Sequence, residues 1–385
     1  MKHNISGFEN FVNIDEYIRE FLENMTYNRT NVCIQGGYMR ILHCADIHLD
    51  SALSTSLTAD QAVRRRNEIL MTFVQMIKYA QKQHVNIVII AGDMFDTDII
   101  LPKTKHIVLD CIRKCPDIQF LYLTGNHDTQ SLQADAGGNG WPPNFKIMTK
   151  TALYYEKAGV CIYSLKDTGE LERIRPDRRT INIVVYHGMV NRPSDFAGYN
   201  IDYLALGHIH SYSAARIDER GVCCYCGCLE PRGYDECGSK GFVILDINGS
   251  SISHRFVPFA SRHAVSLKIN IEGCYTTPDV IACIESVCSQ NNVTSKDMVK
   301  AELNGDVTDD YEIDISYILQ HFANQFFSFR IEDNTRVRKK ETDMDRLGMF
   351  EKQFVQLILN SDEETSDKEK IIKYGIKALR GDTII

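Results

Sequence analysis

The sequence lacks any apolar run long enough to cross a membrane. A transmembrane helix needs roughly 20 consecutive apolar residues, and no part of the 385-residue chain contains such a run. The first residues, MKHNISGFENF, also lack the apolar core of a secretory signal. We therefore expect a cytoplasmic protein with no membrane partner.

An excess of positive charge is also missing. The chain carries 43 Lys and Arg against 51 Asp and Glu, for a net charge of −8. Proteins that bind DNA through its phosphates usually cluster their basic residues. Here the basic residues gather only in three short clusters, at 64–66, 173–179 and 336–340, which are typical of solvated faces. Composition therefore neither requires nor excludes a nucleic-acid partner.

Cysteine is abundant, with 13 residues in the chain. Because no export signal is present, we expect reduced thiols rather than disulfides. Cys223 and Cys226 have the spacing of one half of a zinc site, but no second pair with that spacing follows. We therefore interpret the cysteines between Cys223 and Cys237 as small buried side chains.

Hydrophobic patterning divides the chain into four regions. Residues 1–38 are expected to form an N-terminal extension, and residues 336–385 two terminal helices. Within 39–262, alternating strands and helices indicate an α/β domain with a largely parallel sheet, and shorter, crowded strands further on indicate a second sheet packed on the first. Residues 263–335 follow a β-α-β-α-β order, which predicts a small separate α/β domain.

Polar side chains follow five of the expected strands at the point where each strand ends. These side chains are Asp46 and His48, then Asp93, then Asn126 and His127, then His187, and finally His208 and His210. In an open α/β sheet the functional crevice lies outside the carboxyl ends of the strands. We therefore expect these residues, which are far apart in sequence, to converge in space.

The types and spacing of these residues predict a metal centre. In Asp46-x-His48 and His208-x-His210, an extended backbone directs both side chains to the same side. Without His127 the set offers seven ligands, more than one tetrahedral ion needs. It fits two divalent ions about 3.5–4 Å apart that share one carboxylate. Imidazole mixed with oxygen ligands suits Mn²⁺, Fe or Zn better than Mg²⁺ or Ca²⁺, and we expect Mn²⁺.

The order Asp-x-His, Gly-Asp, Gly-Asn-His-Asp, His and Gly-His-x-His resembles the signature of the calcineurin-like metallophosphoesterase superfamily. Within it, the chain is most similar to the SbcD-type nuclease subunit of the SbcCD DNA-repair complex. That likeness rests on four segments: MRILHCADIHLDS at 39–51, AGDMFDT at 91–97, LGHIHS at 206–211 and CGCLEPRGYDECGSKGFVILDI at 226–247. It covers roughly residues 39–333 and leaves the N-terminal extension outside.

The resemblance implies a two-sheet α/β/β/α sandwich with a small capping domain. It also implies a division of ligands: Asp46, His48, Asp93 and His210 hold one metal, whereas Asp93, Asn126, His187 and His208 hold the other. Asp93 would bridge the two ions, and His127 would stabilise the transition state or protonate the leaving oxygen without binding metal. Some family members place a second catalytic histidine three residues after the bridging aspartate, where this chain has Asp96.

The function implied is a DNA exonuclease or endonuclease that works with an SbcC-like coiled-coil ATPase, as a monomer or a homodimer. The alternative is a phosphatase or phosphodiesterase acting on a nucleotide, a phosphoprotein or another small phosphoester. The ligands recognise only phosphoryl oxygens and do not separate the two. The segment 226–247 and the added domain favour the nuclease, whereas the acidic charge favours the alternative. A non-catalytic scaffold is disfavoured because every expected ligand is present.

Each of three further features is open to two interpretations. Trp141, in a Gly- and Pro-rich loop, is expected to anchor that loop, although it could contact a substrate base. The helix expected at Met344–Leu359 carries an apolar stripe that either docks the ATPase, as the resemblance implies, or packs on its own domain. Asp128 either orients His127 or caps a turn.

Overall fold

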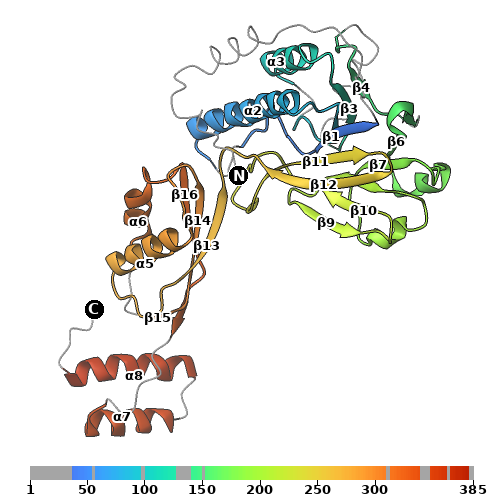
Figure 1. Cartoon of the computed structure of the whole chain (residues 1–385). Coiled ribbons are helices and arrows are strands. Elements are labelled where there is room, and N and C mark those ends of the chain that lie inside the picture. Colours follow the sequence, from blue (N-terminus) through green and yellow to red (C-terminus); the bar gives the residue numbers. More distant parts are fainter. Residues whose placement is uncertain are drawn as a thin grey trace.

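The computed structural model describes residues 37–53, 57–96, 100–126, 140–149, 152–308, 313–338, 347–361 and 365–380. All but the last two residues of the expected extension 1–38 lie outside these ranges, as do His127 and Asp128. Two six-stranded sheets form the bulk of the protein, and a three-stranded and a two-stranded sheet follow. Figure 1 shows the two large sheets stacked on each other, with the later elements extending to one side.

The first large sheet contains four parallel strands in chain order: β1 (Tyr38–Cys44), β2 (Ile87–Ala91), β3 (Gln119–Leu123) and β4 (Phe145–Ile147). On the other side of β1, the strand β11 (Gly241–Asn248) pairs antiparallel and is followed by the edge strand β12 (Ser251–Pro258). The second sheet has the order β5 (Leu153–Tyr155), β6 (Val160–Leu165), β7 (Ile181–His187), β8 (Tyr203–Gly207), β10 (Val222–Tyr225) and β9 (Ser213–Arg216). Its four central strands are parallel.

Alternate side chains of a single strand contribute to two different apolar cores. In β2 all five residues are buried. Ile87, Ile89 and Ala91 pack toward the second sheet, whereas Val88 and Ile90 pack toward the helices. Successive side chains of a strand point to opposite faces, so a continuous apolar run indicates a strand that is covered on both sides. The prediction of a two-sheet α/β sandwich is confirmed.

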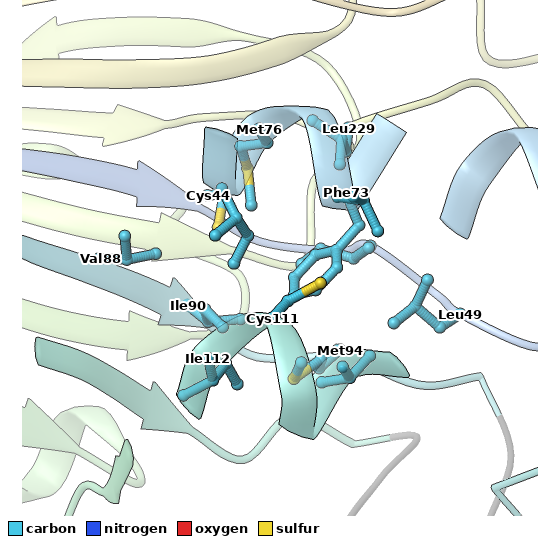
Figure 2. Packing of buried hydrophobic residues seen from close by; sticks show 14 of the residues in the cluster. Cys44, Leu49, Phe73, Met76, Val88, Ile90, Met94, Cys111, Ile112 and Leu229 are labelled. Atoms are coloured by element: carbon cyan, nitrogen blue, oxygen red, sulfur yellow. The ribbon is translucent and has the colours of Figure 1, made fainter. Parts of the chain in front are cut away.

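Two helices cover the outer face of the first sheet. Thr58 caps α2 (Ala59–Lys82) in a capping box with Gln61, and Pro102 begins α3 (Pro102–Arg113). Figure 2 shows Phe73 of α2 next to Cys111 of α3, with Val88 and Ile90 of the sheet to one side. The outer face of the second sheet is covered by two 3₁₀ helices, η2 (Thr168–Arg173) and η3 (Pro193–Phe196), which bury Leu171 and Phe196. A further 3₁₀ turn, η1 (Glu156–Ala158), precedes β6.

The expected β-α-β-α-β order is present in the small unit, which comprises β13 (Ala264–Asn270), α5 (Thr277–Gln290), β14 (Met298–Asn304), α6 (Ile315–Phe322) and β16 (Ser328–Asp333). Its three strands are parallel, and both helices pack on one face around a separate apolar cluster. Two short strands, β15 (Asp306–Thr308) and β17 (Arg336–Arg338), extend it. The domain boundaries themselves remain a prediction.

The C-terminal helices α7 (Met349–Leu359) and α8 (Thr365–Arg380) pack against each other. The expected start of the first helix at Met344 needs correction, because Gly348 has extended backbone angles and is its N-cap. The Gly348 N–H donates to Glu351 at 2.6 Å, which closes the first turn. Within the described residues, no helix is long and apolar enough to cross a bilayer.

An ion-pair network joins the sandwich to the small unit. Arg65 of α2 is fully buried and pairs with Glu68 and Glu230. Arg262, which immediately precedes the small unit, pairs with Glu68, and its guanidinium lies 3.7 Å from the centroid of the Phe327 ring. A buried charge that loses its partner is strongly destabilising.

Replacing Arg65 by Met should therefore lower the free energy of unfolding by about 3–5 kcal/mol, because Glu230 would be left buried without its cation. Urea denaturation of the full chain measures this change. Arg64→Met is the matched control: Arg64 pairs with the same Glu68, but its side chain is 70% exposed, and its loss should cost at most about 1 kcal/mol. Equal effects of the two substitutions would contradict this account.

Candidate metal centre

All seven predicted ligands lie where strands of the two large sheets end. Asp46 and His48 follow β1, Asp93 follows β2, Asn126 follows β3, His187 ends β7, and His208 and His210 follow β8. His48 and His210 meet with their Nε2 atoms 3.3 Å apart, and His187 Nε2 lies 2.9 Å from Asn126 Oδ1. Side chains from both sheets therefore converge, as the sequence predicted.

The backbone at this edge adopts conformations that are rare for residues with side chains. The φ angles of Asp46, His48, Asp93 and His208 are 50°, 50°, 49° and 95°, so the extended backbone expected at Asp46, His48 and His208 was wrong. Such left-handed conformations cost about 1–3 kcal/mol each and persist where the surrounding structure imposes them, often at functional sites. Cross-strand hydrogen bonds fix them here: Asp46 N–H donates to Gly92 O at 3.1 Å and His48 N–H to Asp93 O at 3.0 Å.

Glycine is required beside two of the candidate ligands. A Cβ atom at Gly125 would lie 2.0 Å from Asp93 Oδ1, and a Cβ atom at Gly92 would lie 2.0 Å from His187 Nδ1. No real side chain tolerates such contacts. These glycines thus allow the Asp93 carboxylate and the His187 ring to approach the neighbouring loops.

The first group of side chains comprises Asp46, His48 and His210, whose ligand atoms all lie within 4.8 Å of one another. His210 Nε2 lies 3.8 Å from Asp46 Oδ1. The other ring nitrogens face carboxylates: His48 Nδ1 lies 2.8 Å from Asp96, and His210 Nδ1 lies 2.6 Å from Glu236. A carboxylate accepts a hydrogen bond, so His210 Nδ1 carries the proton and His210 Nε2 offers a lone pair.

This arrangement fits a divalent cation. The Nε2 atoms of His48 and His210 and the carboxylate of Asp46 face one another, and each of these atoms can offer a lone pair. Atoms of this kind repel one another unless a cation lies between them. Burial raises the pKa of Asp46 to about 6, although the neighbouring His187 and His210 oppose the shift. A bound cation would compensate for that burial.

The second group comprises Asp46, Asp93 and His187. His187 Nδ1 donates to Ala91 O at 2.8 Å, so its Nε2 faces Asp93 Oδ2 at 3.3 Å and Asn126 Oδ1 at 2.9 Å. Although burial opposes the shift, the hydrogen bond and the charge of Asp93 raise the pKa of His187. A proton on His187 and a divalent cation are thus alternative ways to balance Asp93.

Asp46 belongs to both groups, and Asp93, a member of the second group, also faces a histidine of the first. Asp93 Oδ2 is 3.3 Å from His187 Nε2 and 3.9 Å from His48 Nε2, and the residue is 2% exposed. The ring of His208 is 5.5 Å from the ring of His187, centroid to centroid, and its backbone N–H donates to both oxygens of Asp46 at 3.0 Å. Two carboxylates, those of Asp46 and Asp93, thus face side chains of both groups.

The structure adds residues whose role the sequence analysis did not assign. Asp96, Arg232 and Glu236 lie behind His48 and His210, and the buried Lys240 donates to the backbone oxygen of His210 at 2.7 Å. Three of the four belong to the segment 226–247, which carries part of the family resemblance. Only the tertiary structure reveals which ligand each of them contacts.

The cysteine segment does not form a zinc site with Cys223-x-x-Cys226. Cys223 packs in the outer cluster of the second sheet, whereas Cys226 packs between the sheets, so the two thiols do not face a common point. Burial raises the pKa of Cys223 to about 12.

Trp141 stacks on Phe145 with ring centroids 4.2 Å apart, which supports its interpretation as an anchor for the loop.

Comparison with known proteins gives the class of this site. Residues 39–212 match the model of the family described as calcineurin-like phosphoesterase. The uncharacterized metallophosphoesterase YhaO of Bacillus subtilis is 26% identical over 57% of this chain and 60% of its own length. The DNA double-strand break repair protein Mre11 of Sulfolobus acidocaldarius is 23% identical over 80% of this chain and 85% of its own length.

A second Mre11, from Saccharolobus solfataricus, is 25% identical over 54% of this chain, which spans 61% of that protein's length. Among solved structures, the purple acid phosphatase PPD1 of yellow lupin matches 58% of this chain at 14% identity, with a TM-score of 0.36, a likeness too loose to carry weight.

Residues 39–212 thus form a calcineurin-like phosphoesterase domain. The side chains at its strand ends form groups that can hold metal ions, and this family uses divalent metal ions.

Asp93→Asn should be the most damaging change to a ligand, because a neutral amide cannot supply a bridging charge to two cations. Elemental analysis of the variant loaded with Mn²⁺ should find fewer than two metals per chain. Asp50→Asn is the control: Asp50 also follows β1, but its carboxylate accepts from Leu101 N and Thr104 Oγ1. The control should keep both metals, and two metals of normal affinity in Asp93→Asn would refute the bridging role.

Proposed function

We propose that this protein is a two-metal phosphodiesterase that cleaves DNA. The observation that carries the proposal is the pair of ligand groups that share Asp46, with Asp93 Oδ2 3.3 Å from His187 Nε2 and 3.9 Å from His48 Nε2. Two of the relatives named above are DNA double-strand break repair proteins, which supports DNA as the substrate. The segment 226–247 and the small α/β unit support the same choice.

The ligand assignment is part of the proposal. Asp46, His48 and His210 hold one cation, Asn126, His187 and His208 hold the other, and Asp93 contacts both. The mixed nitrogen and oxygen ligands favour Mn²⁺, with Fe and Zn as alternatives. When bound, the two cations lower the pKa of water and neutralise charge on phosphoryl oxygens.

The side chains of the protein supply orientation and proton transfer. Glu236 fixes the tautomer of His210, the Ala91 carbonyl does the same for His187, and Asp96 lies 2.8 Å from His48 Nδ1. His127 follows the ligand Asn126 directly. We assign to His127 the donation of a proton or a hydrogen bond to the leaving oxygen.

An alternative substrate is a nucleotide, a phosphoprotein or another small phosphoester. The net charge of −8 favours it, because a DNA backbone attracts basic surfaces. The ligands themselves do not discriminate, since both kinds of substrate present the same phosphoryl oxygens. Activity on several substrates therefore has to decide between them.

The C-terminal helices offer a surface for the proposed SbcC-like ATPase. The expected apolar stripe divides in two: Leu347 is buried and Ile358 packs against the cluster with α8, whereas Phe350 is 77% and Leu357 is 70% exposed. Packing within the C-terminal helices therefore buries only part of the apolar stripe. A coiled-coil partner could bury the remainder. We propose a homodimer as a second assembly of this protein.

Removing metal should abolish activity. The purified full chain, stripped with a chelator and then supplied with Mn²⁺, is tested on linear duplex DNA, single-stranded DNA and bis-p-nitrophenyl phosphate. We expect no hydrolysis after stripping and recovery with Mn²⁺, because the ligand groups cannot activate water without cations. Hydrolysis of DNA supports the nuclease, and hydrolysis of the small ester alone supports the alternative. Full activity of the stripped protein would refute both.

His127→Ala should keep both metals and a normal melting temperature while kcat on DNA falls by roughly 10²–10⁴-fold, the usual contribution of general acid catalysis. The loss should be smaller on bis-p-nitrophenyl phosphate, whose leaving group needs little protonation. His106→Ala is the control, since His106 is a largely exposed histidine on α3, and its kcat should not change. Loss of a metal in His127→Ala would make His127 a ligand, and normal kcat on DNA would exclude the catalytic role.

A further inference from the structure

Three charged side chains behind the metal-facing nitrogens form one connected group. His48 Nδ1 lies 2.8 Å from Asp96 Oδ1, and Glu236 Oε1 accepts from His210 Nδ1 at 2.6 Å. Arg232 joins the two carboxylates, because its Nη1 donates to Asp96 Oδ1 at 2.8 Å and its Nη2 to Glu236 Oε1 at 3.3 Å. We call Asp96, Arg232 and Glu236 the clamp.

We propose that the clamp is a positioning device that fixes the rings of His48 and His210, so that both Nε2 atoms face the same cation. Asp96, which stands where some family members carry a second catalytic histidine, is then a positioning residue in this chain. The inference rests on the ligand assignment made under the proposed function.

The geometry gives the clamp its rigidity. A guanidinium is planar and presents its donors in a fixed fork, so a single arginine can hold two carboxylates at a set separation. The side chains of Asp96, Arg232 and Glu236 are only 17%, 20% and 9% exposed. At this burial the ion pairs are screened far less than pairs on an open surface. The Arg232 backbone N–H also donates to Glu236 Oε2 at 2.7 Å.

The clamp connects segments that are distant in sequence. Asp96 lies in the loop after β2, whereas Arg232 and Glu236 lie between β10 and β11. The same later segment holds the backbone of His210, since Lys240 Nζ donates to His210 O at 2.7 Å and Cys228 N–H at 3.3 Å. His210 is therefore fixed at its ring and at its carbonyl by one stretch of chain.

Rotation of either ring would move an Nε2 atom away from the cation. A carboxylate on the opposite ring nitrogen prevents that rotation and increases the basicity of the ligand. An amide in place of the carboxylate loses both the charge and the pairing with Arg232. Carboxylates that orient metal-binding histidines typically contribute about 10–100-fold to metal affinity.

Calorimetric titration of the full chain with Mn²⁺ tests the clamp. Asp96→Asn and Glu236→Gln should each weaken one of the two Mn²⁺ sites by about 10–100-fold and leave the other unchanged. The double variant should lose less than the product of the two single effects, because the clamp acts as one unit. Unchanged affinities in both folded single variants would overturn the proposal.

Asp202→Asn is the matched control. Asp202 also accepts hydrogen bonds from an arginine, Arg220, at 2.8 and 3.0 Å, but it precedes β8, at the opposite end of that strand from the ligands. Its substitution should lower the melting temperature and leave both Mn²⁺ affinities intact. If this control weakened Mn²⁺ binding as much as the clamp variants do, their effect would be a general loss of stability and the proposal would fail.

Two further variants complete the test. If either clamp carboxylate variant fails to fold, Arg232→Lys replaces it, because a single ammonium keeps the charge but lacks the fork. Weaker binding at one site supports the clamp, and unchanged binding overturns it. His210→Ala should remove one Mn²⁺ entirely. Retention of both ions in His210→Ala refutes the ligand assignment itself, whereas loss of one ion there with intact binding in the clamp variants refutes the clamp alone.

Discussion

Asp46 and Asp93 are almost fully buried where the carboxyl ends of strands from two sheets meet. Removing a carboxylate from water costs several kcal/mol unless an opposite charge compensates for it. Around these two residues the backbone is held in left-handed conformations, and the Nδ1 atoms of His48 and His210 lie beside carboxylates. Divalent cations satisfy all of these features together, so metal binding and the local fold stabilise each other.

The packing of the two-sheet sandwich allows these buried charges to lie close together. Strands such as β2 are buried on both faces, and their apolar side chains fill one core against the helices and another against the second sheet. The ends of such strands are positioned by packing that lies entirely outside the metal centre. A site built on strand ends of this kind keeps its ligands within the narrow tolerances that metal coordination needs.

One short segment, residues 230–236, takes part in two charge networks. Glu230 pairs with the buried Arg65 close to the joint with the small unit, whereas Arg232 and Glu236 contact the residues behind the metal-facing histidines. The small unit and the metal centre are therefore connected through a few residues of one loop. This connection gives the joint a physical route by which the position of the small unit could affect the ligands.

The sequence by itself determined the α/β class, the two sheets and the seven candidate ligands, because apolar strands followed by polar residues are local patterns. It also indicated the family, since the signature depends on residue order alone. It did not reveal β4, whose three residues are too few to show a period, or the start of α7 after Gly348. Nor did it reveal that Asp96 and Glu236 each contact a different histidine, or that Arg232 joins the two carboxylates. Such contacts join residues as many as 136 positions apart, and only the folded chain decides which side chains meet.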